Sequence, residues 1–368
     1  MRELSVRALN RALLHRQGLL ARRKLPVTRM VERLVGLQAQ APTPPYFGLW
    51  SRLADFRPAQ LSGLLADRSV VRIVLMRGTI HLVSAADCRF LRPLVQPALG
   101  RSLGSSVYGP SLVGLDLADL AKEGRALLAE RPMSPAELGR AMTNRWPDRD
   151  PIALANAVRT HVPLVQVPPR GLWGRSAAAR HTTAETWLHG PLDAEPSIDR
   201  LVSRYLAAFG PASAADVQAW SGLTRLGEVL DRLRPELRTF RDDRGAELFD
   251  LPQARLPDQD TPAPARLIAP YDNVVLAHAN RARIIGDELR KKLWPVNGVL
   301  PGMLLVNGFV AGTWRLDGGT LRLTPSGPLS TADRAELTEE GATLLTFAAP
   351  DETATHDIRF EQSGVERN

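Results

Sequence analysis

The residues whose type and spacing best suit chemistry are two glutamines, Gln38 and Gln40, which flank Ala39 in the segment GLQAQAPTPP. Each primary amide has two donor hydrogens and two acceptor sites, so it needs partners wherever it is buried. Neither side chain titrates between pH 5 and 9, and its chemistry is therefore the placing of hydrogen bonds. The alternative interpretation is structural, because the same amides can satisfy backbone groups at a helix end.

Other catalytic patterns in the chain are weak. The seven histidines show no H-E-x-x-H or other metal-ligand spacing, and neither a P-loop nor G-x-G-x-x-G occurs. The single cysteine, Cys88, excludes a disulfide framework and a cysteine-rich zinc site. Asp272 suits catalysis or a turn equally well. His278, in AHANRARII with Arg281 and Arg283, suits a phosphate contact or a structural role.

An amphipathic helix is predicted just before the glutamines, over residues 27–35, because apolar residues recur there at i, i+3, i+4, i+7 and i+8. Pro42 and the two prolines that follow it end the helix, and Ala41 is biased away from helical backbone. If the helix continued through the motif, Gln38 and Gln40 would point about 200° apart. If the chain is extended there, both amides point to one side.

Three stretches share one order of elements, in which helices precede two short strands joined by a turn containing Arg-Gly. The turns are Arg77-Gly78, Arg170-Gly171 and the Arg-Gly at 244–245. They join VVRIVLM to TIHLV, PLVQVPP to LWGR, and ELRTF to AELFDL. This order is the outline of a winged helix with its hairpin wing. An ordinary α/β chain with common glycine turns is the alternative.

Helices in these stretches carry clear start signals. Ser134 with Glu137, and Ser213 with Asp216, have the spacing of a capping box. Further helices are predicted over residues 58–65, 152–158 and 226–233.

The last third changes from helices to strands after the proline-rich segment LPDQDTPAPAR, which is typical of a linker. Strands are predicted for RLIAP, NVVLAHA, GMLLV, FVAGTW and GTLRLTP, with a type I′ turn at Asn307-Gly308 and a helix over residues 331–345. The prediction is an α+β chain of three tandem winged-helix repeats and a C-terminal β-barrel-like domain, either a small barrel or a strongly curved sheet. The predicted units are residues 1–105, 106–190, 191–255 and 256–368.

The formal charge of the chain is +8, and only four of its 47 basic residues are lysine. A positive balance favours a polyanionic partner, most simply nucleic acid. Guanidinium groups suit phosphate, although GC-rich coding also raises arginine content. The basic segment at 290–292 is either a phosphate contact or a solvated surface. The candidate DNA-binding residues are Arg77, Arg170, Arg281, Arg283, Arg290, Lys291 and Lys292.

No apolar run approaches the roughly 18 residues of a membrane span. The N-terminus alternates arginine and leucine and has no A-x-A cleavage site, which argues against a secretory signal. We therefore expect a cytoplasmic protein that has no membrane partner.

The segments LVGLQAQAPTPPYFGLWSRL, VLMRGTIHLV, PLVQVPPRGLWGRS, FGPASAADVQAWSGL and YDNVVLAHANRARII together resemble the bacterial AlkZ-type family of interstrand-crosslink DNA glycosylases. The resemblance covers nearly all of residues 5–350. It implies a concave DNA-binding scaffold of tandem winged helices and azinomycin-type resistance. It also implies a catalytic motif, which is Gln-x-Gln in one branch of the family and Gln-x-Asp in the other branch. Gln38 and Gln40 match that motif. The implied partner is double-stranded DNA carrying alkylated or crosslinked guanine, bound by a monomer.

The chemistry implied by this resemblance is hydrolysis of an N-glycosidic bond that is already labile. Alkylation of guanine at N7 places positive charge on the base, so the base leaves neutral and needs no general acid. A glutamine carbonyl can accept a hydrogen bond from the attacking water, while the second amide orients water or opposes developing charge. No metal or organic cofactor is required. The alternative function is a non-catalytic winged-helix DNA-binding protein, such as a regulator.

Overall fold

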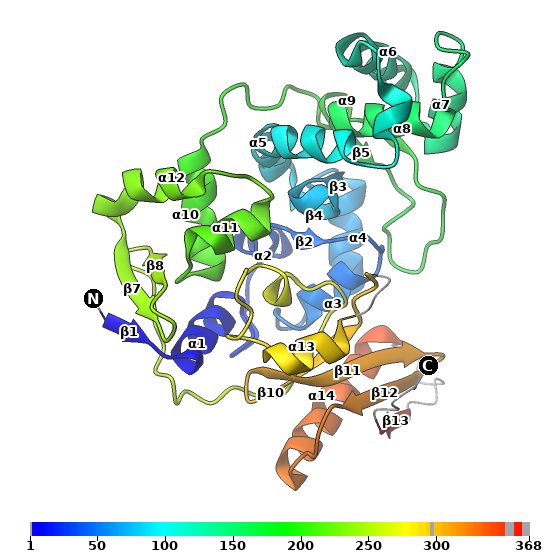
Figure 1. Ribbon diagram of the computed structural model, residues 1–368. Helices are drawn as coiled ribbons and strands as arrows, with labels where there is room; N and C mark the ends of the chain where they lie inside the picture. Colours follow the sequence, from blue (N-terminus) through cyan, green and yellow to red (C-terminus); the bar gives the residue numbers. More distant parts are fainter. Residues whose placement is uncertain (1, 295–297, 350–356, 363–368) are drawn as a thin grey trace.

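The central sheet of the computed structural model, which describes residues 2–294, 298–349 and 357–362, has five strands in the order β2-β4-β3-β5-β6 (Figure 1). β3 pairs antiparallel with both β4 and β5, and β2 lies at the edge beside β4. The strands are β2 (Leu37–Gln38), β3 (Val70–Val74), β4 (Ile80–Ser84), β5 (Leu164–Gln166) and β6 (His181–Thr183).

The chain enters β2 from α2 (Val27–Arg33) through a turn that needs glycine. Gly36 has φ +89° and donates its N–H to the Val31 carbonyl at 3.0 Å. A Cβ at Gly36 would lie 2.6 Å from Val83 Cγ1, too close for any side chain. The helix therefore stops before the glutamines, and of the two backbone arrangements that the sequence allows, the extended one occurs.

The first and third predicted hairpins are confirmed. β3 and β4 are joined through η1 (Met76–Gly78), and β7 (Arg238–Asp242) pairs with β8 (Glu247–Asp250) across the Arg-Gly turn at 244–245. The second hairpin differs, because β5 pairs with β6 and the segment LWGR forms no strand. Pro168 and Pro169 lack the N–H that a ladder needs, so β5 stops before them and Arg170 lies in the connection.

Helices surround the sheets much as predicted. The capping boxes at Ser134 and Ser213 are confirmed, as are the helices expected near residues 58–65, 152–158 and 226–233. Three-residue and four-residue 3₁₀ turns, η2 (Gly109–Leu112) and η3 (Arg234–Glu236), connect some of them. The helices up to residue 233 are α1 (Val6–Arg16), α2, α3 (Pro44–Trp50), α4 (Pro58–Ala66), α5 (Ala85–Gly104), α6 (Leu117–Glu130), α7 (Pro135–Met142), α8 (Pro151–His161), α9 (Ala184–Leu188), α10 (Ile198–Phe209), α11 (Ala214–Ser221) and α12 (Leu226–Leu233).

Strand pairing crosses the predicted unit boundaries. β1 (Arg2–Leu4) pairs in parallel with β7, more than 230 residues later in the chain, and β3 pairs with β5 across the boundary at 105. The first two predicted units thus share the central sheet, and the N-terminal strand completes the β1-β7-β8 sheet. In Figure 1 the β1-β7-β8 sheet and the helices α6 to α8 lie on opposite sides of the central sheet.

The C-terminal region forms an open sheet in the order β13-β12-β11-β10-β9, and in the described residues no closed barrel occurs. The barrel expectation is therefore wrong, since β9 and β13 are edges that do not meet. NVVLAHA is also no strand: the Asp272 side chain caps the short 3₁₀ helix η4 (Asn273–Val275) instead. Asn307 and Gly308 form the predicted turn, with φ of 45° and 85°. The other elements here are β9 (Arg266–Ile268), β10 (Gly302–Val306), β11 (Phe309–Asp317), β12 (Thr320–Pro325), β13 (Asp357–Phe360), α13 (Asp287–Leu293) and α14 (Thr331–Ala348).

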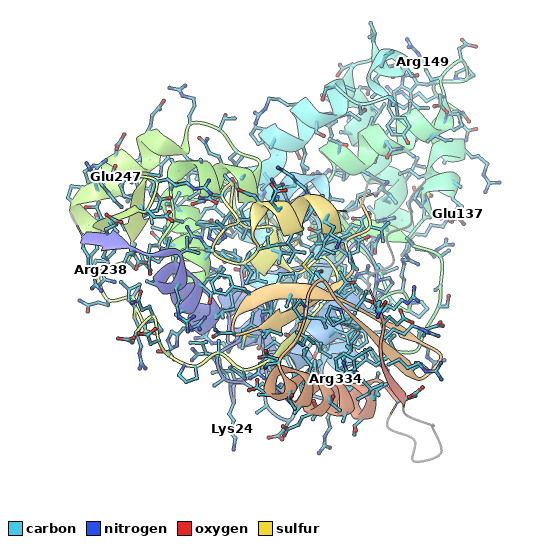
Figure 2. All side chains as sticks on the ribbon, turned by 60° about the horizontal axis from the view of Figure 1, so that its bottom comes forward. Lys24, Glu137, Arg149, Arg238, Glu247 and Arg334 are labelled. Atoms are coloured by element: carbon cyan, nitrogen blue, oxygen red, sulfur yellow. The ribbon has the colours of Figure 1, made fainter. Side chains whose placement is uncertain are left out.

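The two faces of the central sheet pack into different cores. Ile73 and Val83 belong to the core that α5, α10 and α11 cover, whereas Leu37 and Leu82 belong to the core that includes α3, α4 and the C-terminal sheet. Because side chains alternate along a strand, Gln38 lies on the first of these faces. Figure 2 labels charged side chains on widely separated elements, with Arg149 near one extremity of the view and Arg238 near another. No helix in the described ranges is long and apolar enough to cross a membrane.

Candidate active site

Gln38 and Gln40 lie on one edge of the central sheet, where β2 runs antiparallel to β4. Gln38 is opposite His81, and the Ala39 N–H donates to the Ile80 carbonyl at 2.7 Å. The two side chains leave the chain at the end of β2, where the extended backbone gives way to a bend at Gln40. They differ in exposure, because Gln38 is 8% exposed and Gln40 is open to solvent.

Both carboxamides are held by their carbonyl oxygens. The Oε1 atom of Gln38 accepts a hydrogen bond from Arg77 Nη2 at 2.8 Å, and that of Gln40 accepts one from the Ile80 backbone N–H at 3.2 Å. Guanidinium and backbone N–H groups only donate, so these contacts assign the oxygen and nitrogen ends of each amide. Within the described residues, each glutamine oxygen has a second acceptor site that no hydrogen bond occupies. The amide hydrogens of both side chains are likewise left for further partners.

Arg77 reaches Gln38 from the tip of the β3–β4 hairpin. Its backbone is left-handed, with φ 56° and ψ 20°, and its guanidinium turns inward. Besides Gln38, it donates to the Trp220 carbonyl at 2.8 Å and to Asn273 Oδ1 at 3.2 Å. Burial, followed by the nearby charge of Arg281, lowers the pKa of Arg77 to about 10. The guanidinium therefore stays charged at neutral pH, in contact with three separate parts of the chain.

A narrow cavity adjoins Gln38. Its water-accessible volume is about 10 Å³, the size that holds roughly one water molecule. Its lining comes from the glutamine strand, from α3 and from the loop before η4, and it includes Gln17, Gln38, Arg52, Asp272 and Asn273. A cavity of this size beside an oriented carboxamide has room for a single water.

Asp272 and Arg52 form a buried ion pair in the wall of this cavity. The two Nη atoms of Arg52 donate to the two carboxylate oxygens at 2.7 and 2.8 Å, and Asp272 Oδ1 also accepts from the Val274 N–H at 3.0 Å. The next residue, Asn273, accepts from Arg77 and donates to the Gly36 carbonyl at 3.3 Å. This loop was not assigned to the glutamine site from the sequence, although YDNVV is one of the segments that carry the family resemblance.

His81 was also missed by sequence reasoning. It is fully buried, it faces the same side of the sheet as Gln38, and its Nδ1–H donates to the Thr79 carbonyl at 3.1 Å. Burial, followed by the charge of Arg77, lowers its pKa to about 3. Within the described chain its Nε2 atom has no hydrogen-bond partner. His81 is therefore a neutral neighbour of Gln38 at physiological pH.

Arg72 supports the motif from the opposite face of the sheet. It is 1% exposed, and its Nη2 donates to the Ala39 carbonyl at 2.8 Å, between the two glutamines. Its Nε and Nη1 atoms find no partner in the part of the chain that is described. Burial and then the charge of Arg170 lower its pKa to about 10. Arg170 thus lies near Arg72, where it donates to the Ala177 carbonyl at 2.9 Å.

Two of the predicted DNA-binding residues join the electrostatics of the site. Burial and then the charge of Arg290 lower the pKa of Arg281, just as burial and then the charge of Arg281 lower that of Arg77, so each of these guanidinium groups lies near the next. The Arg281 guanidinium stacks over the Trp294 ring at 4.5 Å. On the exposed side of α13, Lys291 pairs with Glu288 at 2.8 Å and Lys292 is open to solvent.

The remaining sequence candidates lie in internal surroundings. Arg283 is 4% exposed and donates to the Pro211 carbonyl at 2.6 Å, which accounts for it structurally. His278 is buried and its Nε2–H donates to the Phe209 carbonyl at 3.1 Å. Burial raises the pKa of the Cys88 thiol to about 12. In the described residues no three histidine, cysteine or acidic side chains gather in a way that could hold a metal ion.

Comparison with known proteins adds two findings. The model of the family described as "DNA glycosylase AlkZ-like" matches residues 31–347. The fold is similar to that of the Streptomyces sahachiroi DNA glycosylase AlkZ, with a TM-score of 0.82 and 19% identity over 98% of this chain and 100% of that one. No curated protein sequence matches significantly.

Proposed function

The chain belongs to the AlkZ-like family of DNA glycosylases, and from that premise we propose that it hydrolyses the N-glycosidic bond of N7-alkylpurine adducts and unhooks interstrand crosslinks. Gln38 and Gln40 hold the attacking water in this proposal. The enzyme would act as a monofunctional glycosylase in repair and in self-resistance to a DNA-alkylating natural product. Membership of an enzyme family disfavours the alternative of a non-catalytic winged-helix regulator.

The observation that carries the proposal is the arrangement of the two carboxamides. They lie two residues apart at the end of β2, with both carbonyl oxygens held by N–H donors, and Gln38 borders a cavity of single-water size. Groups that are already oriented lose little free energy in reorganising when charge develops in the transition state. The arrangement is therefore suited to guiding a water toward the anomeric carbon.

Neutral amides match a substrate that is already activated. An N7-alkylated guanine is cationic, so the electron pair of the breaking bond returns to the base, which leaves as a neutral molecule. The sugar becomes oxocarbenium-like, water adds to C1′, and a proton is released to solvent. A glutamine oxygen can accept a hydrogen bond from that water, but it is too weakly basic to activate attack on an unmodified nucleoside.

Asp272 is the nearest rival for the role of base, since it borders the same cavity. Both of its oxygens are already acceptors for Arg52, and one also caps η4. Taking a proton from water would remove the negative charge that balances a buried guanidinium, which costs several kcal/mol. We therefore assign Asp272 to holding the loop and the cavity wall.

DNA would be bound by the positive groups next to the site. Arg281, Arg290 and Lys292 are the residues we propose to contact backbone phosphates, because Arg281 lies near Arg77, Arg290 lies near Arg281, and Lys292 is exposed on the same helix as Arg290. Lys291 lies on the same helix and belongs to the proposed surface, and Arg170 remains a candidate farther along the sheet. A crosslinked guanine cannot swing freely into a closed pocket, so an open concave surface fits this substrate better than ordinary base flipping does.

The decisive experiment is a product assay. The protein is incubated with duplex DNA that carries N7-methylguanine or an N7-linked crosslink, and free base and abasic sites are measured. Gln38→Ala and Gln40→Ala are each expected to slow single-turnover release by roughly 10²-fold, the scale for losing a preorganised polar group. Gln253→Ala, which removes a glutamine from an exposed loop, is the matched control. Wild-type rates in both site variants would refute the assignment.

A further inference from the structure

The contact between Arg77 and Gln38 links the tip of one hairpin to the motif strand. Arg77 Nη2 lies 2.8 Å from Gln38 Oε1, while Nη1 lies 2.8 Å from the Trp220 carbonyl oxygen. We propose that Arg77 is a positioning residue that fixes the Gln38 carboxamide in its reactive orientation. This inference rests on the proposed function, and it replaces the DNA contact that the sequence suggested for Arg77.

The guanidinium fixes both the place and the direction of the amide. A guanidinium has donors and no acceptor, so only the oxygen end of Gln38 can face it. Its planar fork is anchored at the end of α11 through Trp220 and at η4 through Asn273, and it cannot follow the glutamine if that side chain rotates. A free glutamine would lose rotamer entropy each time it adopted the reactive orientation. Because Arg77 holds the Gln38 side chain in the folded protein, that rotamer entropy is lost during folding and not during the reaction.

The backbone around Arg77 supports the same conclusion. The residue adopts a left-handed conformation that costs about 1 kcal/mol or more outside glycine, and it does so in the turn that aims its side chain inward. The β3–β4 ladder that carries this turn also pairs with β2. Gln38 thus lies on β2 and Arg77 in the turn that leads into the neighbouring strand β4, and the pairing of these strands keeps the two residues close.

The contact with Arg77 also determines which hydrogen-bonding groups of Gln38 are available to the reaction. With one acceptor site of Oε1 taken by a cation, the second site and the two Nε2 hydrogens remain. The bound cation draws electron density toward Oε1, and the Nε2–H groups become better donors. Gln38 then orients water by donating as well as accepting, while Gln40, held by a neutral N–H, keeps the more basic oxygen.

A double-mutant cycle tests the proposal. Single-turnover excision of N7-methylguanine at saturating enzyme is measured for wild type, Arg77→Met, Gln38→Ala and the double variant, together with the Kd for duplex DNA. We expect Arg77→Met to slow excision about tenfold or more and to change Kd little, and the double variant to equal Gln38→Ala. Arg77→Lys keeps the charge without the fork and is expected to fall between wild type and Arg77→Met. The exposed Arg225→Met, at a residue that shares the left-handed backbone (φ 62°) and pairs with Glu228 of α12, is the matched control.

The outcomes separate this proposal from the function on which it rests. Effects of Arg77→Met and Gln38→Ala that multiply would show that Arg77 acts independently of the glutamine and would overturn the inference. A weakened Kd with an unchanged maximal rate would overturn it as well, in favour of a phosphate contact. If Gln38→Ala itself excises like wild type, the proposed function fails whatever Arg77 does. Should Arg77→Met not fold, Arg77→Lys with Gln38→Ala completes the same cycle.

Discussion

The side-chain oxygen of Gln40 accepts the backbone N–H of Ile80 at 3.2 Å, at the point where the ladder between β2 and β4 ends. The Gln40 side chain thus bonds to the Ile80 N–H, which in a regular antiparallel ladder would donate to a backbone carbonyl of the neighbouring strand. The Ala39 carbonyl, which is the regular ladder partner of the Ile80 N–H, accepts instead from Arg72. The sheet therefore holds the Gln40 carboxamide by its oxygen, although Gln40 as a whole is exposed to solvent.

This contact leads to a prediction about pH. Wild-type excision is expected to be nearly flat between pH 6 and 9, since neither glutamine titrates and the cationic base leaves without a proton. Gln40→Asp recreates the other branch's Gln-x-Asp pattern and should add a rising acid limb, because only the ionised carboxylate can act as a base. Its midpoint should lie near the reference value of about 4, lower if the Ile80 N–H still donates to it and higher if phosphates are close.

The pH profile is measured in single turnovers at saturating enzyme, with spontaneous depurination subtracted. An ionisation of wild type in this range that survives substitution of both glutamines would contradict the water-positioning role. It would return the chemistry to a residue other than the two glutamines.

The Arg52–Asp272 pair predicts a stability effect. Asp272→Asn leaves a buried guanidinium without its counter-charge and should lower the free energy of unfolding by about 3–5 kcal/mol. Combining it with Arg52→Gln should recover part of the loss, because no isolated charge then remains. Chemical denaturation of the three variants measures this. If Asp272→Asn is fully stable but inactive, Asp272 belongs to the chemistry and its structural assignment is wrong.

Buried histidines predict acid sensitivity. Burial lowers the pKa of His81 to about 3 and of His181 to about 4, below the unfolded value near 6.5. As pH falls through 6.5 the unfolded chain takes up protons that the folded chain refuses, so stability is lost progressively down to about pH 3–4. The loss should be about 2 kcal/mol per histidine at pH 5. His81→Gln should flatten this decline in denaturation curves, whereas substitution of exposed His189 should not.

DNA binding should depend steeply on salt. Each phosphate neutralised contributes about −0.9 to the slope of log K against log salt concentration. Lys292→Ala and Arg290→Ala should each reduce the magnitude of that slope by about 1 on undamaged duplex. Arg359→Ala, on the edge strand β13, serves as the control, and fluorescence anisotropy gives the affinities. An affinity that does not change with salt would contradict the basic surface around α13.

Local chemistry in the sequence determined much of the fold. Capping boxes at Ser134 and Ser213, the Asn307-Gly308 turn and the apolar spacing of residues 27–35 act within a few residues, and each produces the element it predicts. Alternation of apolar residues and the glycines at 78 and 245 likewise place two of three hairpins. The Gln-x-Gln motif was recognisable for the same reason, because its residues are adjacent in the chain. Its extended backbone, however, depended on Gly36 meeting Val83, a contact between strands.

Tertiary structure alone decided how the site is assembled. Arg52 and Asp272 are 220 residues apart, and Arg77 and Asn273 are 196 apart, so no local pattern pairs them. An arginine beside a glycine turn gives the same sequence pattern whether its side chain contacts DNA phosphate or the protein interior. Burial distinguishes the two, because a guanidinium withdrawn from water must find internal acceptors, as Arg77 does in Gln38, Asn273 and Trp220. The open C-terminal sheet was undecided for the same reason, since closure depends on which edges meet.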